Sequence, residues 1–200
     1  MYTMFFVSST VYYGIALNAV NFKLDPFMYM VVNGLMEVPA YSLSAPVVAR
    51  FGRVPPTVIS FFICGGTILA LAFIPNEIKW LVIIAAMAGK FFISSAYQIL
   101  YLVSTEVFPT EIRLQGIGTS SFVSRIGSLI APYVTDYLGP LLPWVPSVVF
   151  GLLSLLAGVA GIFVPETLSR HLPETIKELE EEALIRKRRK SQKAVEENDS

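Results

Sequence analysis

Residues that build soluble catalytic and metal sites are scarce in this 200-residue chain. It has one cysteine, Cys64, and one histidine, His171. An internal disulfide cannot form, and a metal site made of His and Cys ligands is excluded. The sequence also has no Walker loop, no paired histidines and no Ser/His/Asp set. It therefore offers no catalytic residue, no metal ligand and no resident cofactor, and it argues against an enzyme.

Charge is also scarce over most of the chain. Charged residues make up 15% of the sequence, against about 25% in average soluble proteins. Residues 1–165 hold 7 Lys/Arg and 6 Asp/Glu, whereas residues 166–200 hold 8 and 9. Hydrophobic residues make up 54%, and the mean hydropathy is +0.62. A soluble enzyme and a nucleic-acid binder are both poor fits to so apolar a chain, whose net charge is zero.

Long apolar segments recur along residues 1–165. A helix needs about 20 mostly apolar residues to cross a bilayer, and backbone in lipid is helical because unpaired polar groups are too costly there. We therefore predict an all-α membrane protein with a six-helix transmembrane domain over residues 1–165 and a charged cytoplasmic tail over residues 166–200. The predicted spans are 1–22, 27–49, 54–75, 79–103, 115–138 and 143–164.

The positive charges predict the orientation of these spans. The second and fourth connections share one side with the tail, and together they carry 11 Lys/Arg, whereas the other side carries only Lys23 and Lys79. Because Lys and Arg concentrate in cytoplasmic loops, both termini are predicted to be cytoplasmic. In the tail, Ile176, Leu179 and Ala183 have the spacing of a short amphipathic helix.

Three charges interrupt the predicted spans near their centres: Glu37, Lys90 and Arg125. Each costs roughly 2.5–3.5 kcal/mol if it faces lipid unaided, so all three are expected to face the bundle interior or water. Substrate sites of secondary transporters lie at this depth. A structural pair of Glu37 with Lys90 or Arg125 is the alternative. Two cations and one carboxylate leave one surplus positive charge, which an anionic ligand group would satisfy.

Polar and aromatic residues share helical faces with these charges. At helical spacing, Tyr41 falls on the face of Glu37, and Tyr97 falls on that of Lys90 with Gln98 beside it. The first span contributes Tyr12 and Tyr13. These residues complete a candidate substrate-binding set, although tyrosines in a helix bundle also serve packing.

Several segments occur in the order and spacing of a known family. They are residues 37–41 (EVPAY), 50–53 (RFGR), 89–91 (GKF), 104–113 (STEVFPTEIR), 124–133 (SRIGSLIAPY), 165–167 (PET) and 172–175 (LPET). With these motifs the chain resembles the C-terminal half of the organic cation, anion and carnitine transporters of the major facilitator superfamily. The branch that it resembles most is the carnitine, or zwitterion, branch.

The resemblance implies six helices of a twelve-helix bundle, with a substrate cavity between two halves and transport by alternating access. It implies a small organic ion as substrate, a plasma-membrane location, and an N-terminal six-helix half supplied by the same gene or a second chain. A coupling ion, Na⁺ or H⁺, stays open. The position of Arg125 is one where cation-preferring members carry Asp. A truncated or half-length protein without transport activity of its own is the alternative.

A second set of charges lies at the predicted cytoplasmic ends of the spans. It consists of Arg50, Arg53, Glu106, Glu111 and Arg113. These charges act either as topology determinants alone or, as the family resemblance implies, as a charge latch between the two halves of an outward-facing carrier.

Overall fold

The computed structural model describes residues 1–18, 25–73, 79–108, 111–142 and 144–164. Every regular element in these residues is helical, which confirms the all-α prediction for this part of the chain. The predicted tail helix lies outside the described residues. The elements are α1 (Tyr2–Leu17), α2 (Pro26–Phe51), α3 (Val54–Phe73), α4 (Lys79–Val107), α5 (Arg113–Pro132), the π-helix η1 (Tyr133–Leu138), α6 (Gly139–Leu141) and α7 (Val145–Ile162).

Three helices differ most from the predicted boundaries. Helix α1 ends at Leu17, whereas the predicted span ran to residue 22. Helix α4 runs to Val107, past residue 103, because residues 80–107 contain no proline and a single glycine. The fifth predicted span is one rod with three parts, since α5 ends at Pro132 and continues through η1 into α6. Pro132 and Pro140 lack backbone N–H donors, and the wider π turn lies between them.

Local sequence explains where α2 begins and ends. Asp25 caps its N-terminus, where the side chain accepts a hydrogen bond of 3.0 Å from the Phe27 N–H. Pro26 follows at the first helical position, where its missing N–H costs nothing. At the other end Gly52 has φ 90°, which glycine adopts readily, and the chain turns directly into α3.

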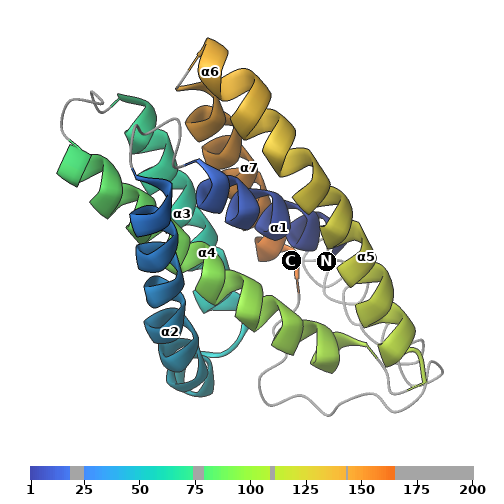
Figure 1. The fold of residues 1–200 in the computed structure, drawn as a ribbon. Coiled ribbons are helices and arrows are strands. Elements are labelled where there is room, and N and C mark those ends of the chain that lie inside the picture. The colour runs from blue at the N-terminus through green and yellow to red at the C-terminus, as the bar shows by residue number, and fades with distance from the viewer. Residues whose placement is uncertain (19–24, 74–78, 109–110, 143, 165–200) are drawn as a thin grey trace, which may run out of the picture.

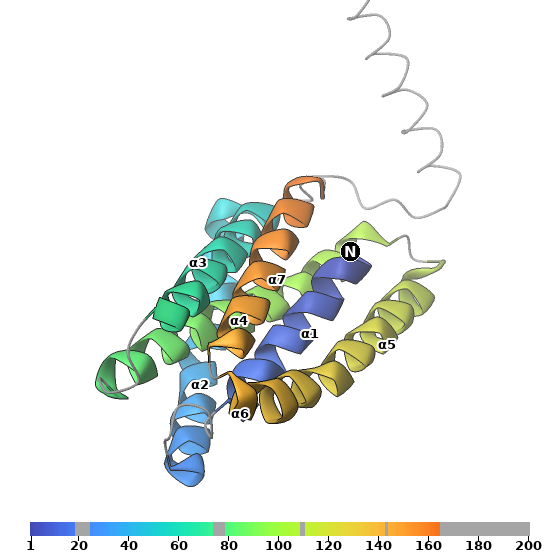
Figure 2. The same ribbon diagram turned by 90° about the horizontal axis from the view of Figure 1, so that it is seen from above.

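The helices pack around a shared core in the middle of the molecule. Helix α3 packs against both α7 and α4, while α2 packs mainly against α4. Helix α1 lies among α5, α7 and α4 (Figures 1 and 2). Phe5, Phe61 and Phe150 are among the largest fully buried side chains of the core between them. This arrangement leaves α2 and α5 at the outside of the described bundle.

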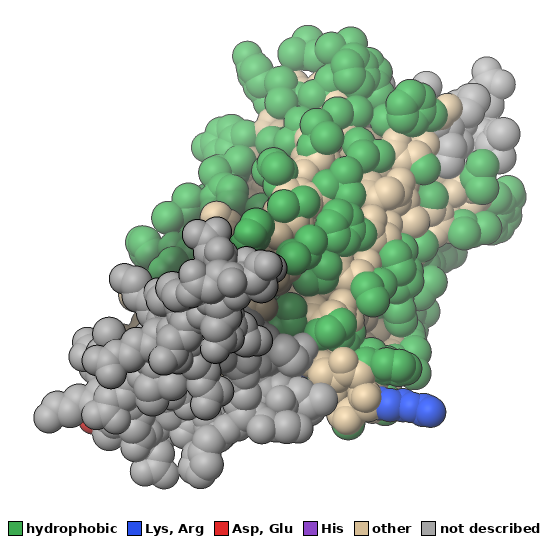
Figure 3. Space-filling model, turned by 180° about the vertical axis from the view of Figure 1, so that it is seen from behind, with side chains coloured by type: hydrophobic (Ala, Val, Ile, Leu, Met, Phe, Trp, Pro, Cys, Tyr) green, Lys and Arg blue, Asp and Glu red, His purple; other side chains and the backbone are tan. Residues whose placement is uncertain are grey.

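Among the described residues, three helices are long and apolar enough to cross a membrane by length and composition: α3, α4 and α7. Helix α1 has 16 described residues, and α2 and α5 carry more polar side chains. Seen from the side opposite to Figure 1, the described surface is mostly hydrophobic, with a positive side chain only at its lower edge (Figure 3). This exterior suits lipid, and the predicted site residues are spread over α1, α2, α4 and α5.

Candidate functional site

Glu37, Lys90 and Tyr12 form a contact triad that joins three helices. The Lys90 Nζ lies 3.2 Å from the Glu37 Oε1. The same ammonium lies 3.1 Å from the centroid of the Tyr12 ring. The Tyr12 hydroxyl donates a hydrogen bond to the Glu37 Oε1. Each member of the triad therefore contacts the other two.

The members of the triad differ in how deeply they are buried. The Lys90 side chain is 1% exposed, whereas that of Glu37 is 26% exposed. Tyr12 is half-buried. The sequence did not decide whether Glu37 pairs with Lys90 or with Arg125. In the structure, Glu37 pairs with Lys90. A neighbouring contact also joins α2 and α4: the Ser95 hydroxyl, which donates to the Phe91 carbonyl at 2.9 Å, lies 3.4 Å from the Ala40 carbonyl.

Tyrosines extend the triad across α1, α4 and α5. The Tyr12 ring lies 5.2 Å from that of Tyr13 and 6.0 Å from that of Tyr97, measured between centroids. The Tyr97 hydroxyl donates to the Ser124 Oγ at 3.3 Å. On α2 the exposed Tyr41 interacts with both Tyr12 and Glu37. We call this line of contacts, from Ser124 through Tyr97 and Tyr12 to Glu37 and Lys90, the polar wall.

Arg125 lies next to the end of the polar wall but outside its contacts. Ser124 is buried, whereas Arg125 is exposed on α5. Within the described part of the chain, no carboxylate lies at ion-pair distance from Arg125. Gln98 on α4 is exposed as well. The predicted substrate-binding residues therefore divide into a connected cluster and two side chains outside it, Gln98 and Arg125. Of these two, Arg125 carries the surplus positive charge.

A glycine sets how close α5 comes to α1. A Cβ built at Gly127 would lie 2.5 Å from the Phe6 carbonyl oxygen, so a larger residue would push the helices apart. Gly127 lies on the same buried face of α5 as Ser120 and Ser124. This close packing keeps Ser124 within reach of Tyr97 and turns the side chain of Arg125 away from α1.

Two residues of this region were not among the predicted site residues. Ser124 accepts the hydrogen bond of Tyr97, and its position directly before Arg125 was the available signal. Phe5 packs edge-on against Tyr97 and Tyr101, with centroid distances of 6.3 and 5.0 Å. Nothing in the sequence distinguishes Phe5 from the other phenylalanines, because its role depends on how α1 crosses α4.

Two of the predicted cytoplasmic charges form an ion pair. Arg53 and Glu106 form an ion pair of 2.5 Å that joins the start of α3 to the end of α4. The Arg113 Nε donates to the Phe108 carbonyl at 3.3 Å. Arg50 is exposed, 5.9 Å from the Phe51 ring centroid, and Glu111 is exposed. The observed pair lies within this six-helix unit, and a latch to a second half stays a proposal.

We expect the Arg53–Glu106 pair to stabilise this end of the bundle modestly. The side chains are 22% and 15% exposed, so solvent screens the pair in part. In a double-mutant cycle of Arg53→Met and Glu106→Gln, thermal unfolding of the purified complete protein should give a coupling energy of about 1 kcal/mol. Purely additive losses would show that the pair adds no stability.

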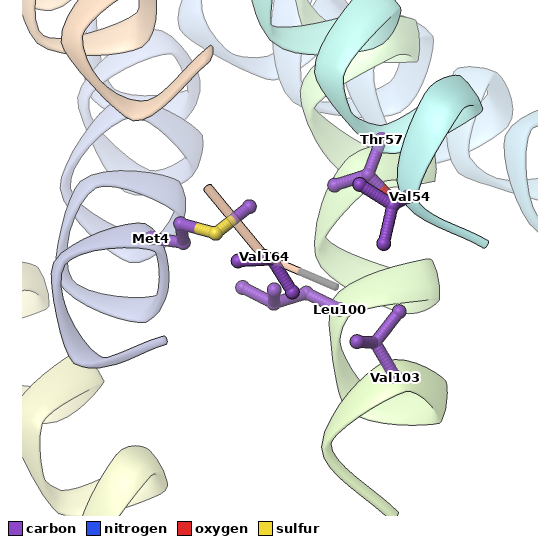
Figure 4. A pocket seen from close by; sticks show the side chains of 6 residues that line it. All are labelled: Met4, Val54, Thr57, Leu100, Val103 and Val164. Carbon is purple, nitrogen blue, oxygen red and sulfur yellow. The ribbon is translucent and has the colours of Figure 1, made fainter. Parts of the chain in front are cut away.

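A small apolar pocket lies apart from the polar wall (Figure 4). Its lining residues are Met4, Val54, Thr57, Leu100, Val103 and Val164. The single hydroxyl among them, that of Thr57, donates to the Arg53 carbonyl at 2.8 Å. The pocket contains none of the predicted site residues and offers no charge to an organic ion, so it does not compete with the polar wall as the candidate site.

Comparisons with known proteins agree with the predicted family. The family model of the Major Facilitator Superfamily matches residues 1–195. The chain is 38% identical over 173 residues to the organic cation transporter protein of Drosophila melanogaster, covering 86% of this chain and 31% of that relative. It is 34% identical over 191 residues to organic anion transporter 3 of Homo sapiens, covering 96% and 35%.

A third relative, organic cation transporter 1 of Caenorhabditis elegans, is 33% identical over 174 residues, covering 87% of this chain and 30% of that protein. The chain thus spans about a third of the length of the curated relatives it matches. The predicted likeness to organic cation and anion transporters is confirmed, while the carnitine branch stays a prediction. By its match over nearly all of its length, this chain belongs to the major facilitator superfamily.

Proposed function

We propose that this chain forms one six-helix half of a membrane transporter for small organic ions. It would work by alternating access against an N-terminal six-helix half, supplied by the same gene or by a second chain. Membership of the superfamily and relatives named as organic cation and anion transporters support this function. The observation that carries it is the polar wall, which joins four helices beside the exposed Arg125.

The chemistry of these residues favours a ligand with both charges, such as a carnitine-like zwitterion. Arg125 would bind a carboxylate through charge-assisted hydrogen bonds. Glu37 and the faces of Tyr13, Tyr41 and Tyr97 would bind a quaternary ammonium group, together with the face of Tyr12 that the Lys90 ammonium does not cover. Gln98 offers a neutral hydrogen-bonding group. Uptake measured with and without a Na⁺ or H⁺ gradient distinguishes ion-coupled transport from facilitated diffusion of the organic ion in the complete protein.

The proposal is tested by uptake into cells that express the complete protein containing this chain. Three labelled probes cover the charge classes: tetraethylammonium, a small aromatic carboxylate and carnitine. We expect saturable uptake of at least one probe above a vector control, with carnitine preferred. Normal surface expression with no saturable uptake of any probe would contradict transport and favour a half-length protein without such activity.

The proposed orientation places both termini in the cytoplasm of a multi-pass plasma-membrane protein. The asymmetry of 11 against 2 Lys/Arg supports it. Single cysteines at positions 24 and 190, on a Cys64→Ala background, can be probed with a membrane-impermeant thiol reagent. We expect labelling from outside at position 24 only. Labelling at position 190 but not at position 24 would reverse the topology.

A further inference from the structure

Lys90 is the only charged side chain that is fully buried among the described residues. Its surroundings on α4 include Met87 and Ile93, which are 2% and 0% exposed. An ammonium group in such a place needs a partner, because burial of an unpaired charge is strongly unfavourable. Glu37 supplies the opposite charge at 3.2 Å, and the Tyr12 ring supplies a π face at 3.1 Å.

The triad leaves Lys90 no open side toward a ligand. Its ammonium is in contact with two protein groups, and its side chain is 1% exposed. Glu37, by contrast, is 26% exposed, and its second oxygen, Oε2, is not the atom bound by Lys90 or Tyr12. A ligand that reaches the polar wall would therefore meet Glu37 and Tyr12, with Lys90 behind them.

We infer that Glu37 and Lys90 act as one electroneutral unit, in which Lys90 positions Glu37 and Tyr12 and does not contact the transported ion. This inference rests on the proposed function and refines it, because it removes Lys90 from the candidate substrate-binding residues. Lys90 is then a positioning residue that ties α4 to α1 and α2. Arg125 is left as the cation of the candidate set that a ligand carboxylate can reach.

Comparing the unfolding midpoints of the single variants with that of the double variant tests this inference in the complete protein. Glu37→Gln leaves the buried Lys90 ammonium without its counter-charge, and Lys90→Met leaves the partly buried Glu37 carboxylate without its cation. Each single variant should lower the unfolding midpoint of the purified protein by about 5 °C or more. The double variant removes both charges together, so its midpoint and its surface expression should return to nearly those of the parent. Met87→Leu, a volume-conserving change one turn away, serves as the control and should alter neither.

A ligand measurement separates positioning from contact. The probe is a small carboxylate without an ammonium group, which has no cation for Glu37 to bind, and its inhibition constant is measured against uptake of a labelled substrate. If Lys90 only positions the triad, the double variant should bind this carboxylate within about threefold of the parent. A loss of about tenfold or more in a double variant that folds normally would show that Lys90 contacts the carboxylate.

Two results would overturn the inference. One is the tenfold loss just described. The other is a double variant that unfolds as early as the single variants, since the two charges would then not neutralise each other. The unfolding measurements do not depend on transport. A parent protein that moves no organic ion would therefore refute the proposed function, while the midpoints would still decide whether Glu37 and Lys90 form one unit.

Discussion

Arg125→Asp in the complete protein is expected to reduce uptake of carboxylate-bearing substrates by on the order of tenfold to a hundredfold. Hydrogen bonds to charged groups contribute about 1.5–3 kcal/mol, and each 1.4 kcal/mol corresponds to about a factor of ten. The change reverses a charge that has no described ion-pair partner in this chain. Simple organic cations should lose less uptake than the carboxylates, because Asp at this exposed position supplies a carboxylate that no cation among the described residues of this chain neutralises.

Folding must be separated from binding in this experiment. An acidic residue near the bilayer centre costs about as much to insert as the arginine it replaces, and Arg125 is exposed rather than packed against α1. Surface expression should therefore be close to that of the parent. Arg125→Lys keeps the charge and serves as the matched control, with a smaller loss. Normal carnitine uptake by a well-expressed Arg125→Asp variant would make Arg125 a structural cation.

Residues 1–200 expressed alone are expected to take up no organic ion above a vector control. The polar wall forms one side of a site, and the two outer helices expose large apolar side chains, among them Phe27 and Leu35 on α2 and Phe122 and Leu129 on α5. A carrier that places its substrate between two halves needs a second wall opposite the first. Without it, Arg125 and Glu37 face lipid or water and enclose no ligand.

Co-expression with the proposed N-terminal half provides the positive control for this expectation. Uptake should return when both halves reach the membrane, and surface labelling of each half confirms that they do. Measurable, saturable uptake by residues 1–200 alone would contradict the half-transporter proposal. It would instead favour a transporter assembled from two copies of this chain.

Sequence reasoning predicted the helices because their formation depends on local properties. Long apolar segments become helices wherever backbone groups must be satisfied internally, and turn residues such as Asp25, Pro26 and Gly52 mark the boundaries of α2. Residues 115–138 were predicted as one uniform helix, and the continuation into α6 was not predicted. The π turn was missed because the apolar pattern around Tyr133–Leu138 is the same for an α-helix and a π-helix.

The depth of a residue along its helix follows from the sequence, and its neighbours across the bundle do not. Glu37, Lys90 and Arg125 were all placed near the centres of their spans, yet the sequence could not decide which cation Glu37 meets. That choice depends on the rotation and the crossing of α1, α2, α4 and α5, which large side chains such as Phe5 and close contacts such as Gly127 against Phe6 determine. The sequence by itself determined an all-α chain with three charges inside apolar spans. Only the tertiary structure decided that Lys90 is buried against Glu37 and Tyr12 while Arg125 stays exposed, because helix packing sets which faces meet.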